Sequence, residues 1–172
     1  MSKRHPVVAV TGSSGAGTST VKRAFEHIFA REEIIPAVVE GDSYHRFERL
    51  PMKQAMADAL AKGENFSHFG PEANLFDKLE DLFKEYGETG GGKKRYYLHS
   101  QEEAEEHNAR LGTDLGPGQF TPWEEIPEGT DVLFYEGLHG GVVGDNYDVA
   151  SKADLLVGVV PITNLEWIQK IH

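Results

Sequence analysis

Cysteine is absent from the 172-residue sequence. A chain without cysteine has no disulfide framework, no thiolate nucleophile, no Cys-ligated zinc and no thiol redox switch. Long apolar runs are absent too, because no segment approaches the roughly 20 residues that span a bilayer. The apolar run that leads to Gly12 is also too short for the core of a signal peptide. These absences predict a cytoplasmic protein that has no membrane partner.

Basic residues are scarce relative to acidic ones. Seventeen Lys and Arg stand against 28 Asp and Glu, and the formal net charge is -11. Such a charge repels nucleic acid, so we expect no nucleic-acid partner and expect any bound phosphate to be captured locally. The composition, 39% hydrophobic and 26% charged, is typical of a globular protein. Length alone favours a single domain over residues 1–172.

Strand and helix patterns alternate along the chain. A helical repeat of apolar residues follows the first strand pattern after a glycine-rich loop. This alternation predicts an α/β fold with a mostly parallel sheet and helices on both faces. With its glycine-rich loop between strand and helix, the pattern resembles the P-loop NTPase fold of the nucleoside monophosphate kinase type. The predicted strands are apolar runs at residues 7–11, 34–39, 132–135 and 155–160.

Two further helices are predicted between the second and third strands, at residues 51–62 and 71–86. Residues 87–128 show little period, and we interpret them as an irregular insertion within the domain, with or without a hairpin. Residues 164–172 resemble the first turns of a helix without a stop signal. This predicts that the domain is truncated at its C-terminal end, a frayed natural terminus being the alternative.

The glycine-rich segment after the first strand follows the P-loop pattern of Gly, four residues, Gly, Lys and then Ser or Thr. Such a loop aims backbone N–H groups at phosphate oxygens in front of a helix N-terminus. The Ser19 hydroxyl is the candidate ligand for Mg²⁺. An ordinary Gly- and Ser-rich turn is the alternative. The predicted ATP-binding residues are Gly12, Ser13, Ser14, Gly15, Ala16, Gly17, Thr18, Ser19 and Thr20.

One position departs from the P-loop pattern, because Thr18 stands where the pattern has Lys. That lysine normally supplies a positive charge between the β- and γ-phosphates, and phosphoryl transfer depends on such positioning and charge stabilisation. A different group must supply the charge, or the activity is low.

Polar residues follow the second strand directly. Asp42 is the candidate catalytic base, because it comes where kinases of this architecture place a carboxylate against the acceptor hydroxyl. His45 and Arg49 follow three and seven positions later and would share a helical face with Asp42, where they could bind a phosphate or sugar oxygens. The alternatives are a helix N-cap for Asp42 and solvated roles for the other two residues.

Glu136 ends the third predicted strand, as the acid of a second nucleotide motif does, and is the second candidate for Mg²⁺. Three histidines in predicted loops, His68, His99 and His139, lack the spacing of a transition-metal site. The basic residues 93–95 could meet a phosphorylated substrate, or could form a solvated hairpin tip.

Six blocks of sequence together resemble the bacterial phosphoribulokinases, a branch of the phosphoribulokinase and uridine kinase family of P-loop kinases. The resemblance runs along nearly the whole chain, and the last three blocks are more specific than a P-loop. The blocks cover residues 12–20, 40–45, 66–69, 86–90, 135–139 and 164–172.

The resemblance implies that ATP, with Mg²⁺, phosphorylates the 1-hydroxyl of ribulose 5-phosphate to ribulose 1,5-bisphosphate for carbon fixation in the Calvin cycle. It implies that Asp42 is the catalytic base, that His45 and Arg49 bind the sugar phosphate, and that Glu136 is the magnesium-associated acid. Lys170 is implied as a charged catalytic residue and is the candidate for the charge that Thr18 lacks. A helix-surface role is the alternative for Lys170.

The resemblance also implies properties of the whole enzyme. Bacterial members are typically octameric homo-oligomers activated by NADH and inhibited by AMP, whereas the cysteines of plant-type members are absent here. A uridine kinase-like enzyme with another hydroxyl acceptor is the alternative activity. A catalytically inert nucleotide-binding fragment is the alternative of a different class, because family chains continue beyond His172 with residues that contribute to the site.

Overall fold

The computed structural model describes residues 5–13 and 15–160. Its contacts divide the chain into two compact units that alternate along the sequence. The sheet unit contains residues 5–41, Phe76–Lys93 and residues 125–160. The second unit contains Asp42–Leu75 and Lys94–Glu124.

A four-stranded sheet forms the centre of the sheet unit, and every strand pairing within it is parallel. The strand order is β2-β5-β1-β8, so the first strand of the sequence lies inside the sheet. This arrangement confirms the predicted fold class. The strands are β1 (Val7–Gly12), β2 (Pro36–Glu40), β5 (Val132–Gly137) and β8 (Leu155–Val159).

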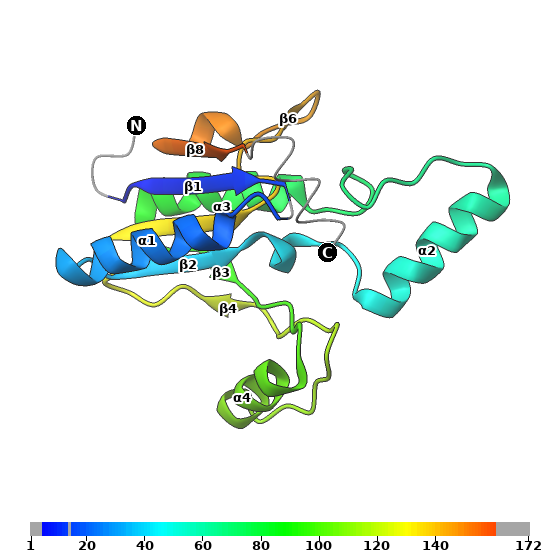
Figure 1. Ribbon diagram of the computed structural model, residues 1–172, viewed down its shortest axis with the longest axis horizontal. Helices are drawn as coiled ribbons and strands as arrows, with labels where there is room; N and C mark the ends of the chain where they lie inside the picture. Colours follow the sequence, from blue (N-terminus) through cyan, green and yellow to red (C-terminus); the bar gives the residue numbers. More distant parts are fainter. Residues whose placement is uncertain (1–4, 14, 161–172) are drawn as a thin grey trace. The chain divides into compact units, whose positions relative to one another are not determined.

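Two helices, α1 (Thr18–Arg31) and α3 (Phe76–Thr89), cover opposite faces of the sheet (Figure 1). On one face, the ring centroids of Phe25 in α1 and Phe134 in β5 lie 5.1 Å apart. On the other face, the ring centroids of Phe83 in α3 and of Tyr135, the next residue of β5, lie 5.5 Å apart. Successive side chains of a strand point to opposite faces, so the apolar run of β5 builds both halves of the core.

The second predicted helix begins later than expected, because α3 begins at Phe76 and not at Pro71. Two of the five residues before it, Ala73 and Leu75, form backbone hydrogen bonds to a distant segment instead of a first helical turn. The Leu75 amide donates to the Tyr44 carbonyl, and the Arg46 amide donates to the Ala73 carbonyl. Tertiary pairing of the backbone therefore displaces the start of the helix.

The remaining elements of the sheet unit are a short hairpin and a helical turn. They are β6 (Val143–Gly144), β7 (Tyr147–Asp148) and the 3-10 helix η2 (Ala150–Lys152). The expected helix at residues 164–172 lies outside the described residues.

The second unit begins within a 3-10 helix, η1 (Gly41–Tyr44), which continues directly from β2. Helix α2 (Arg49–Lys62) confirms the prediction for residues 51–62, although Leu60 of its apolar set is 80% exposed. Tyr97 and Phe120 form an isolated antiparallel bridge. Two short strands, β3 (Lys93–Lys94) and β4 (Glu124–Glu125), pair where the chain passes between the units.

Helix α4 (Gln101–Leu111) lies within the segment interpreted as irregular, and the sequence pattern did not indicate it. Ser100 caps its N-terminus by accepting a hydrogen bond from the Glu103 amide, and Gly112 ends it with a φ of 68°. Among the described residues, no helix has the length and apolar character needed to cross a membrane.

Candidate functional site

The glycine-rich loop lies at the carboxyl end of β1 and leads into α1, as predicted. Gly15 and Gly17 have φ angles of 80° and 98°, which favour glycine over any residue with a side chain. A Cβ on Gly12 would come within 2.7 Å of the Val159 carbonyl oxygen. Each of these glycines therefore meets a conformational or steric requirement of the loop, while Ser14 lies outside the described residues.

Helix α1 begins at Thr18 without a side-chain cap from Gly17. The first amides of an α-helix have no partner within the helix, so an uncapped N-terminus can donate to an anion. Ser19 and Thr20 are exposed in this first turn. The geometry suits the phosphate role predicted for the loop.

Two carboxylates end neighbouring strands beside the glycine-rich loop. Glu136 of β5 is in register with Glu40 of β2 and with Val10 of β1. Lys22, one helical turn after Thr18, forms an ion pair of 2.6 Å with Glu40. Burial opposes the charge of Lys22, but the hydrogen bond to Glu40 and the charge of Glu136 leave its pKa raised.

A pocket of about 260 Å³ lies within the second unit. Pockets for small organic ligands hold roughly 300–1,000 Å³, so this volume suits a ligand smaller than a nucleotide. Its apolar lining comes from Phe47, Met52, Met56 and Tyr97. Its polar lining comes from Asp42, His45, Arg49, Lys53, His68 and His99.

Asp42 lies in the pocket between two histidines. Its carboxylate oxygens lie 3.4 Å from Nε2 of His45 and 3.6 Å from Nε2 of His99. The interaction with His45 lowers the pKa of Asp42 more than burial raises it, and the charges of His99 and His68 lower it further. Asp42 is therefore ionised near neutral pH and can accept a proton.

His45 is held in place by its ring and by its backbone. Its Nδ1 lies 2.7 Å from Oδ1 of Asn74, and its carbonyl accepts a 2.6 Å hydrogen bond from Nη2 of Arg95. Burial lowers the pKa of His45, but the contacts with Asp42 and Asn74 outweigh burial and the pKa is raised. The raised pKa of His45 and the lowered pKa of Asp42 both favour the charged forms of this pair.

Arg95 also supports the turn that carries Asp42. Its Nε donates to the carbonyl of Ser43 at 2.8 Å, and its guanidinium lies 3.6 Å from the ring centroid of Phe120 and 4.6 Å from that of Trp123. Burial lowers the pKa of Arg95 to about 10, so the group remains charged at neutral pH. A solvated hairpin tip was one expectation for residues 93–95. Arg95 instead stacks on two aromatic rings and supports the pocket.

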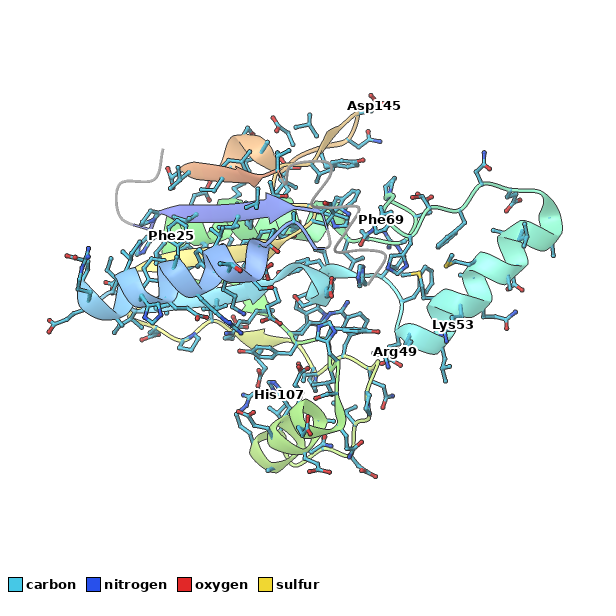
Figure 2. The ribbon with its side chains drawn as sticks, viewed as in Figure 1. Phe25, Arg49, Lys53, Phe69, His107 and Asp145 are labelled. Atoms are coloured by element: carbon cyan, nitrogen blue, oxygen red, sulfur yellow. The ribbon has the colours of Figure 1, made fainter. Side chains whose placement is uncertain are left out.

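The first two turns of α2 bring Arg49 and Lys53 to the pocket; both are labelled in Figure 2. The guanidinium of Arg49 lies 5.9 Å from the Tyr97 ring centroid and 3.4 Å from the His99 carbonyl. The Arg49 amide donates to the carbonyl of Gly118, which anchors the start of the helix. Asp42, His45 and Arg49, the three residues predicted from the sequence, therefore line one pocket.

Sequence reasoning missed several members of the pocket. Lys53 follows Arg49 by one helical turn, and this spacing could have indicated it. His68 and His99 were noticed only as unsuitable metal ligands. Among the described residues, no group of three His, Cys, Asp or Glu side chains could hold a metal ion. Lys170, the predicted charged catalytic residue, lies outside the described residues.

A parallel sheet, a glycine-rich loop that leads into a helix, and an acid at the end of the neighbouring strand are together the features of a P-loop protein. The family model described as "Phosphoribulokinase / Uridine kinase family" matches residues 7–172. The chain belongs to this family.

Curated relatives support the same family. The chain is 58% identical over 172 residues to the chromosomal phosphoribulokinase of Cupriavidus necator, covering 99% of this chain and 57% of that protein. It is 53% identical over 173 residues to the phosphoribulokinase of Nitrobacter vulgaris, covering 100% of this chain and 58% of that protein. The chain therefore spans somewhat more than half the length of these relatives.

A solved structure of phosphoribulokinase from Rhodobacter spheroides is also similar, with a TM-score of 0.83 and 49% sequence identity. The similarity covers 99% of this chain and 56% of that structure. The fold of the family thus extends over nearly all of this sequence.

Proposed function

We propose that this chain supplies the nucleotide-binding and acceptor-binding parts of a phosphoribulokinase, which transfers the γ-phosphoryl group of ATP to ribulose 5-phosphate. The observation that carries the proposal is the pocket of the second unit, in which the carboxylate of Asp42 lies among the cationic groups of Arg49 and Lys53 and two histidines. A phosphorylated sugar presents the hydroxyl and the anion that such a pocket can bind.

The glycine-rich loop supports ATP as the donor. The left-handed Gly15 and Gly17 and the uncapped start of α1 suit the oxygens of a polyphosphate. Ser19 and Glu136 would hold Mg²⁺, because a hydroxyl and a carboxylate are the hard oxygen ligands that this ion prefers. Bound Mg²⁺ would neutralise charge on the transferred group. Glu40 is engaged by Lys22, which favours Glu136 as the acidic ligand.

Asp42 is proposed as the general base. Its pKa is lowered by the contact with His45, so the carboxylate is ionised and free of its own proton at neutral pH. The carboxylate would accept the proton of the sugar hydroxyl as that oxygen attacks the phosphoryl group. Its side chain is 55% exposed, which leaves it accessible to a substrate.

Arg49, Lys53 and His45 are proposed to bind the phosphate of the acceptor. Arg49 offers a planar fork of N–H donors, Lys53 offers a compact charge, and His45 offers a charged ring. This set of cations favours a phosphorylated acceptor over an unphosphorylated nucleoside, so a uridine kinase-like activity is the second candidate. Lys170 is proposed to supply the charge that Thr18 lacks.

The properties of the whole enzyme are part of the same proposal. By their likeness to the bacterial phosphoribulokinases, proteins containing this chain are proposed to act in the Calvin cycle in the cytoplasm as homo-oligomers that respond to NADH and AMP. The 58% identity to the chromosomal phosphoribulokinase of Cupriavidus necator supports the activity on which this part of the proposal depends.

A chimera tests the activity. The 172-residue chain replaces the matching segment of the Cupriavidus necator phosphoribulokinase, and an assay coupled to ADP formation compares ribulose 5-phosphate with uridine. We expect turnover of ribulose 5-phosphate only.

Asp42→Asn should lower kcat by about 100- to 10,000-fold while ATP binding is retained, which is the range for loss of a general base. Turnover of uridine alone would refute the proposed substrate, and unchanged turnover by Asp42→Asn would refute the base.

A further inference from the structure

Asn74 is a buried amide that the predicted site residues do not include. Its exposed fraction is 1%, and it lies in the segment that precedes α3. Its Nδ2 donates two hydrogen bonds, at 3.0 Å to the carbonyl of His68 and at 2.8 Å to the carbonyl of Gly70. Its Oδ1 lies 2.7 Å from Nδ1 of His45. One amide therefore joins the loop after α2 to the ring of a pocket histidine.

These contacts determine the orientation of the amide. Carbonyl oxygens only accept hydrogen bonds, so the Asn74 atom that faces two of them must be the NH₂ group. A flipped amide would place Oδ1 against both carbonyls and leave a buried oxygen repelled by its neighbours. The Oδ1 atom of Asn74 is consequently the atom that faces His45.

The orientation of Asn74 in turn determines the state of the His45 ring. An amide oxygen has no hydrogen to donate, so Nδ1 of His45 must carry the proton of the 2.7 Å hydrogen bond. In a neutral ring with that proton, Nε2 would present its lone pair to a carboxylate oxygen of Asp42 at 3.4 Å. A second proton on Nε2 replaces this repulsion with a charge-assisted contact.

Charged and titratable groups from several segments face His45. Asp42 of η1 favours the cation, and Arg95, whose Nη2 binds the His45 carbonyl, opposes it. The ring of His68 lies 5.0 Å away by centroids, and that of Tyr97 lies 6.2 Å away. The contact with Asp42 and Asn74 prevails over these opposing groups and over burial, which leaves the pKa of His45 raised.

We propose that Asn74 is a positioning residue that holds His45 as a donor at both ring nitrogens, and so maintains a fixed positive charge beside Asp42. The role of this charge in binding the acceptor's phosphate rests on the proposed function. Asn74 itself acts through His45 and is not a lining residue of the pocket.

The ¹⁵N resonances of the His45 ring test the proposal in the unmodified 172-residue chain. They are assigned by their loss in His45→Gln. We expect both ring nitrogens to be protonated at pH 6, and the ring to retain the Nδ1 proton after it becomes neutral. A neutral ring protonated only at Nε2 would overturn the proposal without any change to Asn74.

Substitutions supply the second test. Asn74→Leu and Asn74→Ala should each move the titration midpoint of His45 to lower pH, because both remove the acceptor of the Nδ1 proton. Asn108→Leu is the control, because the Asn108 amide joins α4 to the loop after it through hydrogen bonds with Leu115 and Thr113, and neither partner lines the pocket. An unmoved midpoint in a folded Asn74 variant would overturn the proposal, as would an equal shift in the control.

The chimera separates this inference from the proposed function. We expect Asn74→Leu to raise KM for ribulose 5-phosphate about tenfold with a smaller change in kcat, and Asn108→Leu to leave KM unchanged. A shifted His45 midpoint with an unchanged KM would overturn the role in acceptor binding. A chimera without any turnover would contradict the proposed function, whereas the titration of His45 would still decide the role of Asn74.

Discussion

At the scale of single residues, the pocket combines groups of opposite charge at close range. The contact between Asp42 and His45 lowers the pKa of the carboxylate and raises that of the imidazole, so the pH range in which both side chains are charged is widened. Arg95 and Asn74 bind the backbone and the ring of His45 respectively. The pocket thus holds the Asp42 carboxylate and the His45 ring in fixed positions before a ligand binds, which is the condition for electrostatic preorganisation.

The pair should make stability depend on pH. The raised pKa of His45 gives a stabilisation that is complete below its ordinary value of 6.5 and is lost as pH rises through the raised pKa. The lowered pKa of Asp42 gives a second stabilisation. It is complete above 3.8, the ordinary pKa of this side chain, and is lost as pH falls through the lowered pKa. Both contributions are therefore complete from about pH 3.8 to about pH 6.5.

We expect His45→Asn to lower the free energy of unfolding by about 1 kcal/mol at pH 5 to 6, the net worth of a buried hydrogen bond, and by less at pH 9. Urea titrations followed by circular dichroism measure the difference. His27→Asn on the exposed surface of α1 is the control and should show no such dependence. A difference that grows toward pH 9 would contradict the assigned charges.

At the scale of elements, local signals explain most helix ends. α1 begins where the glycine-rich loop ends, and α2 ends at Gly63, whose φ is 70°. α4 has a Ser100 cap and a Glu103 three residues later, whose carboxylate accepts a hydrogen bond from the His99 amide. This cap pattern was present in the sequence. The helix was not predicted because the apolar residues of α4 repeat only weakly at helical spacing.

The cap of α4 should contribute measurably to stability. We expect Ser100→Ala to lower the free energy of unfolding by about 1 kcal/mol, because the Glu103 amide loses its acceptor. Ser100→Asp, which restores an oxygen acceptor and places negative charge at the helix N-terminus, should recover the loss. Chemical denaturation of the three proteins decides the matter, and equal stability of all three would show that the cap contributes nothing.

At the scale of the whole molecule, the glycine-rich loop and the pocket lined by Asp42 belong to different compact units. The loop lies in the sheet unit, whereas the pocket lies in the second unit, and the two units follow each other within η1. Nucleotide binding can thus be measured independently of acceptor binding. A chain that binds nucleotide without turnover would be an inert fragment, whereas a catalytic one shows both.

We expect a non-hydrolysable ATP analogue with Mg²⁺ to stabilise the folded chain by about 2.7 kcal/mol at a hundredfold excess over Kd, and to raise Tm accordingly. Gly15→Val should abolish the shift, because a β-branched residue is strained at a φ of 80°. Gly116→Ala is the matched control, since a Cβ there meets its nearest neighbour, Gln119 Oε1, at 3.7 Å. A Tm shift that survives in Gly15→Val would refute the assigned phosphate site.

Sequence alone determined the sheet and the loop of this protein. The strands and α1 are predicted by apolar periods and by the glycine-rich loop between them, and Asp42 is predicted by its place just after β2. These signals are local, so a linear pattern contains them. The family resemblance added roles for His45 and Arg49, and the pocket brings both beside Asp42.

Tertiary structure alone decided how the pocket is completed. His45 and Asn74 are 29 positions apart in the sequence, and Arg95 and Ser43 are 52 positions apart. No period or spacing relates such pairs, because chain reversals determine which polar groups meet. The same pairing of the backbone before α3 displaced the predicted start of that helix. The contacts of the buried Asn74 amide, the stacking of Arg95 and the raised pKa of His45 therefore depend on the tertiary structure.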